Sequence, residues 1–523
     1  MNYRLLKHTF QLMQNRKRFP KLYSLLITSI CFLLLSSCAS KFPVSEYDKL
    51  ESHAYSYQSD SKLGEFFSEE KNSNNNYSGF YPLSKGHDAL LARIAIIEAA
   101  EVSIDVQYYI YRSDESSQLM TWRLFEAAQR GVKVRLLLDD MQSRSDENLA
   151  NLSAHPNIEV RLFNPFRSRK LKGLDFLHDF GRVNHRMHNK SLTVDGVTTI
   201  MGGRNIGNEY FSVGSNVEFS DLDLLIVGPV VSETGEQFDQ YWNHSHSIPI
   251  EWLTVAGTSY NADEVKKWAV EAQLRQKFEH GKYNFAALPF YQQLKQGDLS
   301  LLWGKGRLIY DSPDKITSGE SDLIRGIQEL LDDSRQSLFL VSPYFVPTES
   351  GTQAMVEAAK NGKFITIITN SLASNDVVAV HGWYSKYRKQ LIESGVHIWE
   401  VKSNAKFTST WSITGSSRSS LHAKLILIDI EKLMVGSMNW DPRSARTNTE
   451  MAVIIKNQAY SQKAFDAIHD ELRRNAYFLT IENKQIVWHD LKNQTRFNTE
   501  PKASFLQKLV AWVSGVLPVE DLL

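Results

Sequence analysis

The sequence predicts a duplicated α/β protein, in which two similar domains are related by a pseudo-twofold axis. Two observations predict this arrangement. A strand–helix–strand pattern occurs twice, and a polar motif follows each copy at a similar distance. Composition sets the class, because 523 residues with 42% hydrophobic and 23% charged side chains are typical of a globular protein.

The chain begins with an export sequence. A basic stretch, residues 16–21, precedes an apolar run, residues 22–35, which ends in Leu-Ser-Ser-Cys at Cys38. An apolar core of about 14 residues is short for a membrane span. The motif resembles a bacterial lipobox, so we expect 1–38 to be a signal peptide and Cys38 to carry lipid. The alternatives are an uncleaved anchor helix and an ordinary signal peptide without lipid. Met13 is an alternative start of the chain.

Charge argues against a protein that mainly holds nucleic acid. Lys+Arg and Asp+Glu both number 59, but six of the basic residues precede the first acidic one, Glu46. The remainder has 53 basic against 59 acidic residues, a formal charge of −6. Nucleic-acid-binding proteins usually have the opposite sign. The only cysteines are Cys31 and Cys38, so the mature chain has no internal disulfide and must depend on its core.

The folded part divides into two similar domains. Residues 39–78 are rich in Ser, Asn and Glu and predict a flexible tether. The two strand–helix–strand stretches are residues 103–140 and 337–371, and each helix ends in Ala-Ala-x-x-Gly. We therefore expect domains over 79–251 and 303–484, with a helical connection over 252–302.

The last segment, 485–523, is expected to be a tail with an amphipathic helix. An apolar stripe at helical spacing predicts it: Phe505, Leu506, Leu509, Val510, Trp512 and Val513. Such a helix either lies on a membrane surface or packs on the protein's own core, and the sequence leaves both open.

The same motif, His-x-Lys-x4-Asp-x6-Gly-[Gly/Ser]-x-Asn, occurs in each half. Among 15 histidines, the His-x-Lys-x4-Asp part is expected by chance only about 0.05 times. The first copy consists of His188, Lys190, Asp195, Gly202, Gly203 and Asn205, and the second of His422, Lys424, Asp429, Gly436, Ser437 and Asn439. Two copies at matched places in a repeat indicate a shared site.

The residue types fit a phosphodiester. Residues two apart on a strand point to the same side, so each histidine and its lysine face one pocket. The lysines, with Asn205, Asn439, Gly203 and Ser437, would bind the phosphate oxygens and stabilise charge on five-coordinate phosphorus without a metal. One imidazole would attack phosphorus while the other protonates the leaving alkoxide. No cofactor is expected.

Carboxylates behind the two histidine rings would push the pKa values of the histidines apart. The candidates are Glu450 and either Asp221 or Asp223, which open an apolar strand after each motif. Asp195 and Asp429 belong to the catalytic motifs, but they fall in a turn at the far end of the strand, so we expect them to support the site. A metal site at His178, His185 and His188 is the alternative, without a matching cysteine or carboxylate cluster.

These paired motifs resemble those of the phospholipase D superfamily, over nearly all of the mature chain. Further strings are similar to bacterial cardiolipin synthases of the C type: NHRMHNK, GGRNIGNEYF, TNSLASNDVVAVHGWY and LPVEDLL. The resemblance implies two mixed-sheet α/β domains with the active site at their interface. It also implies a covalent phosphohistidine, with His188 as nucleophile and His422 as general acid. It implies transfer of a phosphatidyl group to phosphatidylglycerol, with phosphatidylethanolamine as donor.

Other outcomes of the same chemistry stay open. Water as acceptor would make the protein a phospholipase D, and a nuclease is disfavoured by charge and tether. A lipoprotein that binds anionic lipid without turnover is the non-enzymatic alternative. We expect a monomer, lipid-anchored in the bacterial cell envelope, with phospholipids and no nucleic acid as partners.

Overall fold

The computed structural model describes residues 49–74, 76–142, 145–214, 218–255, 258–274, 292–293, 296–297, 299–405 and 419–517. The expected signal peptide, its lipobox, Cys38 and the LPVEDLL end from residue 518 onward lie outside these residues. Residues 166–183 group apart from the other described residues and contain three short helices: η2 (Lys172–Leu174), α8 (Asp175–His178) and α9 (Phe180–Val183). Apart from residues 166–183, which belong to the predicted first domain, both predicted domains lie in the other compact unit.

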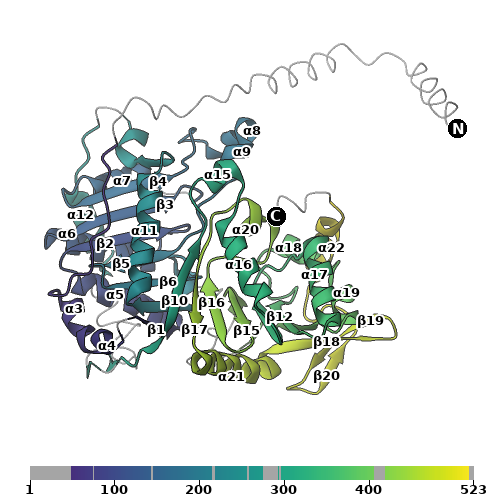
Figure 1. Ribbon diagram of the computed structural model, residues 1–523. Helices are drawn as coiled ribbons and strands as arrows, with labels where there is room; N and C mark the ends of the chain where they lie inside the picture. Colours follow the sequence, from purple (N-terminus) through teal and green to yellow (C-terminus); the bar gives the residue numbers. More distant parts are fainter. Residues whose placement is uncertain are drawn as a thin grey trace, which may run out of the picture. The chain divides into compact units, whose positions relative to one another are not determined.

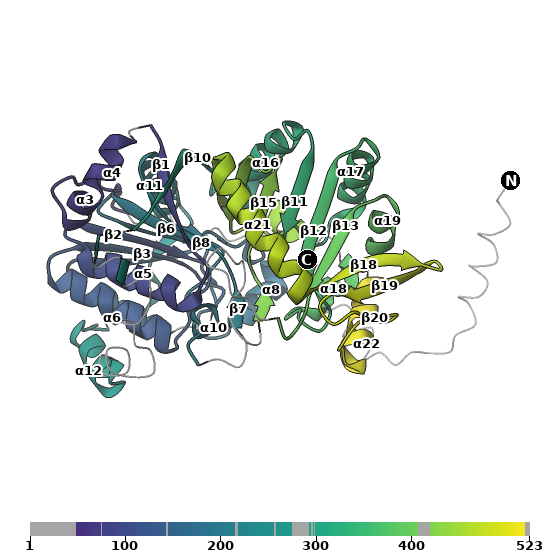
Figure 2. The same cartoon turned by 90° about the horizontal axis from the view of Figure 1, so that it is seen from below.

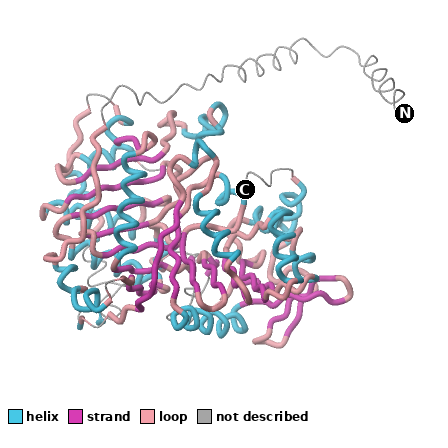
Figure 3. Tube along the Cα trace, viewed as in Figure 1, coloured by secondary structure: helices cyan, strands magenta, loops and turns pink. Residues whose placement is uncertain are grey.

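Eighteen strands of this unit form a continuous sheet built from two halves of matching topology (Figure 1). The first half has the order β1 (Ser78–Leu83), β8 (Asp223–Val227), β6 (Thr198–Gly202), β5 (Ser191–Val194), β2 (Ser103–Tyr108), β3 (Lys133–Asp139), β4 (Ile158–Phe163) and β9 (Ser247–Pro249). The second half has the order β10 (Leu302–Tyr310), β17 (Met451–Lys456), β16 (Lys432–Gly436), β15 (Leu425–Ile428), β11 (Ser337–Val341), β12 (Phe364–Asn370), β13 (His397–Val401), β18 (Ala476–Glu482), β19 (Gln485–Asp490) and β20 (Thr495–Phe497). The halves join where β1 pairs antiparallel with β10. Figure 3 shows the strands of the molecule with helices beside them. The predicted duplicated, mixed α/β fold is confirmed.

The repeated strand–helix–strand units have the expected parallel pairing. In the first half, α6 (Glu115–Gln129) connects β2 to β3, and in the second α17 (Thr348–Lys360) connects β11 to β12. The Asp114 side chain caps α6 by accepting from the Ser117 amide. Gly131 and Gly362 follow the two helices with φ of 102° and 90°, so glycine lets the chain turn sharply into the next strand.

Helices cover both faces of each half (Figure 2). In the first half, α5 (Gly86–Ala99) and α6 lie on the face opposite α11 (Pro229–Asn243). The second half has α16 (Asp322–Asp332), α17, α19 (Arg388–Glu393) and α21 (Gln458–Asn475). One core cluster contains Met201 and Leu224 from the first half and Leu425 and Val453 from the second. This shared core holds the halves together.

Shorter elements complete the described chain. They are α7 (Asp146–Ser153), α10 (Asn208–Phe211), β7 (Glu218–Ser220), η3 (Ile250–Leu253), α12 (Asp263–Glu271), α15 (Lys315–Ser318), α18 (Val378–Tyr384), β14 (Ser419–Leu421), α20 (Pro442–Arg446) and α22 (Phe505–Val516). Of the expected helical connection, α12 is described, whereas residues 275–291 fall outside the described residues. No helix among the described residues has the length and apolarity needed to cross a membrane.

The stretch expected to be a flexible tether differs from that prediction in its described part. It contains α3 (Lys62–Phe66) and α4 (Ser68–Ser73), and Leu63 and Phe67 are buried in the core of the first half. The Ala54 amide donates to Asp239 of α11. The polar composition concealed these few anchoring side chains, so the folded part begins before the predicted boundary at residue 79.

Candidate active site

Each motif histidine is held by a backbone hydrogen bond from the opposite half. The His188 amide donates to the Thr449 carbonyl, and the His422 amide donates to the Ser220 carbonyl. The second contact continues a parallel pairing of β14 with β7, in which Leu421 lies opposite Ser220. Because Thr449 and Ser220 directly precede the candidate carboxylates, this pairing brings each histidine beside a carboxylate of the other half.

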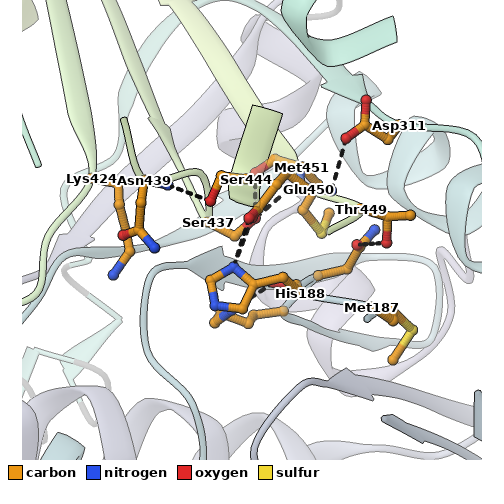
Figure 4. Close-up of polar contacts among 12 residues, drawn as sticks. Met187, His188, Asp311, Lys424, Ser437, Asn439, Ser444, Thr449, Glu450 and Met451 are labelled. Atoms are coloured by element: carbon orange, nitrogen blue, oxygen red, sulfur yellow. Dashed lines mark hydrogen bonds and ion pairs between the residues drawn. The ribbon is translucent and has the colours of Figure 1, made fainter. Parts of the chain in front are cut away.

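The two histidine–carboxylate pairs therefore cross between the halves. His188 Nδ1 lies 2.8 Å and 2.9 Å from the two carboxylate oxygens of Glu450, as Figure 4 shows. His422 Nδ1 lies 2.5 Å from Asp221 Oδ2. The sequence left Asp221 and Asp223 as alternatives, and the structure places Asp221 against the ring. Asp223 instead forms buried ion pairs with two arginines, Arg93 and Arg204.

Each motif lysine folds back over its own histidine. Lys190 Nζ donates to the His188 carbonyl at 2.5 Å. Lys424 Nζ lies 2.9 Å and 3.1 Å from the two ring nitrogens of His422 and donates to the His422 carbonyl. Burial lowers the pKa of Lys190 to about 7 and that of Lys424 to about 8. A bound anion would favour the charged form of both lysines, although neither is part of the lining of the cavity that contains the two histidine rings.

Burial also controls the charge of His188. Its pKa is lowered to about 4, because burial and the nearby Lys190 outweigh the opposing effect of Glu450. Burial would raise the pKa of Glu450, but the His188 and Lys190 charges and the hydrogen bonds outweigh it, so the pKa is lowered. At neutral pH His188 is therefore neutral. Its Nδ1–H donates to an ionised Glu450, which leaves the Nε2 lone pair available.

His422 is subject to similar influences. Burial and the charge of Lys424 lower its pKa, while Asp221 opposes this change. The pKa of Asp221 is lowered by His422 and Lys424 in spite of its burial. Asp221 is therefore an ionised acceptor for the Nδ1–H of the second ring.

Both histidines line one cavity of about 440 Å³. The asparagines of both motifs also line it. Asn205 is committed to the protein, because its oxygen accepts from the Ile110 amide and its amide donates to the Tyr210 hydroxyl. The buried side-chain oxygen of Asn439 has no hydrogen-bond partner among the described residues. Asn439 lies beside Lys424 in Figure 4 and is the freer of the two to meet a ligand.

Gly203 and Ser437 lie against the two carboxylates and are not part of the cavity lining. The Ser437 hydroxyl donates to Glu450. At the equivalent position, a Cβ on Gly203 would lie 2.1 Å from Asp221 Oδ1, so only glycine fits. Glu450 thus has a hydroxyl donor that Asp221 lacks.

The two motif aspartates form hydrogen bonds with backbone amides and not with the histidine rings. Asp195 accepts hydrogen bonds from the backbone amides of Glu101, Val102 and Ser103. Asp429 accepts from the amides of Arg335, Gln336 and Ser337. Each aspartate has a positive φ of 52° in the turn after β5 or β15 and ties that turn to the start of β2 or β11. These contacts support the site through the sheet.

The structure adds cavity residues that the sequence motifs did not mark. Tyr210 and Phe219 pack against the His422 ring with centroid separations of 5.3 Å and 5.1 Å, and Tyr109 packs against His188 at 4.8 Å. Two carboxylates, Asp376 and Asp441, also line the cavity. Burial raises the pKa of Asp441 to about 7. Asp376 lies between strand and helix with only isolated polar neighbours in sequence, so no spacing pattern marked it.

The alternative metal set is not assembled around His188. His185 Nδ1 pairs with the Thr447 carbonyl at 2.9 Å, and His178 lies in the separate segment 166–183. Over the described ranges, no group of three or more His, Cys, Asp or Glu side chains is placed to hold a metal ion.

Comparisons with known proteins found similar chains over most of the sequence. A family model described as "Cardiolipin synthase, PLD-like domain" matches residues 94–242 and 327–473. Cardiolipin synthase C of Escherichia coli (strain K12) is 39% identical over 458 residues, which cover 85% of this chain and 96% of that protein. A cardiolipin synthase of Listeria monocytogenes serotype 4b (strain CLIP80459) is 27% identical over 412 residues, covering 78% of this chain and 72% of that protein. The crystal structure of phosphatidylserine synthase from Haemophilus influenzae Rd KW20 shares the fold, with a TM-score of 0.57 at 15% identity over 87% of this chain and 99% of that chain.

Proposed function

The chain belongs to the cardiolipin synthase family with phospholipase D-like domains, and on that premise we propose that it transfers a phosphatidyl group between phospholipids through a phosphohistidine. The observation that carries the proposal is the crossed arrangement of His188 with Glu450 and His422 with Asp221 around one cavity. Two imidazoles that face the cavity, with a buried lysine against each, suit a phosphodiester whose displacement needs one nucleophile and one acid.

In the first step, the Nε2 lone pair of His188 attacks phosphorus of the donor lipid. The bond from phosphorus to the headgroup oxygen breaks, and His422 gives its Nε2 proton to the departing alkoxide. In the second step, the acceptor hydroxyl gives its proton back to His422 while its oxygen attacks phosphorus. The phosphorus–nitrogen bond then breaks, which restores neutral His188.

The surroundings of the two carboxylates support this division of roles. Glu450 shares its charge between His188 and the Ser437 hydroxyl, whereas Asp221 meets its histidine at 2.5 Å without such a hydroxyl. Asp221 accepts its other hydrogen bond from the Leu222 backbone amide. Its shorter contact with the ring favours a proton on that imidazole. A phosphodiester in the cavity adds negative charge beside both rings, and the proton would then favour His422.

The cavity also supports phosphatidylethanolamine as donor and phosphatidylglycerol as acceptor. Asp376 and Asp441 add negative charge to the lining, which favours the ethanolamine ammonium over a neutral glycerol headgroup. Transfer to a terminal hydroxyl of phosphatidylglycerol yields cardiolipin and releases ethanolamine. A lipid on Cys38 would keep the enzyme at the envelope membrane that contains both substrates.

The decisive experiment incubates the purified protein with phosphatidylglycerol vesicles, with and without phosphatidylethanolamine, and follows the lipids by mass spectrometry. We expect cardiolipin with the unchanged protein and none with His188→Ala. His53→Ala is the matched control, because His53 is 72% exposed and not part of the cavity lining. Phosphatidate without cardiolipin would make the protein a phospholipase D, and no lipid product at all would refute the proposed activity.

A further inference from the structure

Helix α22, near the end of the chain, packs on the protein through small residues. It begins with a capping box formed by Ser504 and Gln507. Ala511 and Gly515 are buried against Gly382 of α18, where a Cβ on Gly382 would lie 2.1 Å from the Ala511 carbonyl oxygen. Such close approach fixes the orientation of α22 about its own axis.

The opposite side of α22 exposes large apolar side chains. Their exposed fractions range from 40% to 81%. The exposed set is Phe505, Leu506, Leu509, Val510, Trp512, Val513, Val516 and Leu517. At 100° per residue these positions span an arc of roughly 160°, centred opposite Ala511 and Gly515.

This pattern is the reverse of an ordinary surface helix, which buries its apolar stripe and turns polar groups to water. The helix contains one charged residue, Lys508, and no acidic residue. An exposed face of this kind marks an interaction site. Its tryptophan, its apolar residues and its single cation are typical of helices that lie in the headgroup region of a bilayer.

The face is continuous with the catalytic cavity through one neighbouring helix. Val380 of α18 and its N-cap residue Val377 line that cavity, and α18 packs along α22. Figures 1 and 2 both show α18 and α22 side by side. A surface that contacts α22 is therefore close to the wall of the site where the lipid headgroup reacts.

We propose that α22 lies in the headgroup region of a phospholipid bilayer with this apolar face toward the acyl chains, and so holds the α18 wall of the cavity at the lipid surface. The inference rests on the proposed function for the identity of the substrate, but insertion of the helix is measurable without turnover. The glycine contact with α18 transmits the position of α22 to the cavity.

A local probe tests the insertion in the full chain. Cys31→Ser and Cys38→Ser remove the native thiols, and Leu509→Cys carries an environment-sensitive fluorophore on the exposed face. Val270→Cys is the matched control, because Val270 is 74% exposed on α12 at the opposite end of the unit in Figures 1 and 2. With vesicles of phosphatidylglycerol and phosphatidylethanolamine, we expect emission at 509 to rise about two-fold and to be quenched by brominated lipid, with no change at 270.

Two outcomes would overturn the inference. Unchanged emission at 509 would show that the face stays in water. A rise without vesicles that follows protein concentration would assign the face to a second copy of the chain.

An activity measurement separates this inference from the proposed function. The double variant Leu506→Ser with Trp512→Ser should lose roughly ten-fold in turnover on vesicles but keep turnover of monomeric short-chain phospholipids. Equal turnover by variant and unchanged protein on vesicles would contradict the role of α22. Absence of product from both lipid forms would instead refute the proposed function, while the fluorophore would still report insertion.

Discussion

Replacing Ser437 by alanine should shift the acid limb of the pH–rate profile to higher pH without changing the fold. The Ser437 hydroxyl donates to Glu450, which in turn accepts from His188 Nδ1. Alanine removes this donor, so Glu450 holds the imidazolium form of His188 more strongly. The pKa of His188, lowered to about 4 in the unchanged protein, should therefore rise.

The size of this effect follows from the hydrogen bond that is lost. A hydrogen bond to a charged group contributes about 1.5–3 kcal/mol, and about 1.4 kcal/mol corresponds to one pKa unit. Only part of the change reaches the ring through the shared carboxylate, so we expect the acid limb to rise by roughly 0.5–1 pH unit. In the proposed mechanism only neutral His188 attacks phosphorus, so the rate of the variant should fall below about pH 5.5 and change little at pH 7.

The assay is the first-turnover burst of phosphoenzyme between about pH 4 and pH 8 with a monomeric short-chain phospholipid, since burst kinetics isolate the first chemical step. Ser461→Ala is the control, because Ser461 is buried on α21 and its hydroxyl has no hydrogen-bond partner among the described residues. An unchanged acid limb combined with an equal loss of rate at every pH would refute the reasoning, since it would make Ser437 a packing residue.

Further substitutions test other parts of the site. Asp221→Asn should keep the burst with a p-nitrophenyl leaving group, which needs no general acid, whereas Glu450→Gln should lower it about 10²–10⁴-fold with any leaving group; equal losses would contradict the assigned roles. Asp441→Asn should weaken the rise of KM with pH for short-chain phosphatidylglycerol, which has no ammonium group, because a carboxyl with a pKa of about 7 ionises above that pH and repels the phosphate. Steady-state kinetics from pH 6 to pH 8.5 measures this effect, and an unchanged profile would exclude Asp441. Gly382→Leu should release α22, since even a Cβ there would lie 2.1 Å from the Ala511 carbonyl oxygen; limited proteolysis should then cut at Lys508 faster than in the unchanged protein, and equal cleavage would show that the contact is dispensable.

The fold was largely predictable from local sequence. The apolar runs at 191–194 and 425–428 are strands over those residues, because short apolar stretches after a turn have few alternatives in an α/β protein. The helices that end before Gly131 and Gly362 also follow from local chemistry. The tether was mispredicted because a few buried side chains, such as Leu63 and Phe67, attach an otherwise polar stretch to the core.

For the site, the sequence predicted the residues of the two motifs but not all of the residues around them. Motif spacing predicted that His188 and His422 share a cavity, but not which carboxylate pairs with which ring. His188 and Glu450 are 262 residues apart, and His422 and Asp221 are 201 apart. Such pairs are fixed by the long-range strand pairing of the two halves, which no local pattern encodes. Asp376 and Asp441 escaped notice for the same reason, because they meet the cavity from separate loops.

The crossed pairs connect the duplication to the chemistry. Neither half contains a complete histidine–carboxylate pair, so the site exists only where the halves are assembled around their shared core. A symmetric site would give two histidines of equal basicity, whereas displacement at phosphorus needs one neutral and one protonated ring. The first contacts that break the symmetry lie behind the rings, where Ser437 donates to Glu450 and Gly203 offers Asp221 no side-chain donor. Asp221 accepts from the Leu222 backbone amide instead, so the two carboxylates have different donors, and the proposed division into a nucleophilic and an acidic histidine depends on this difference.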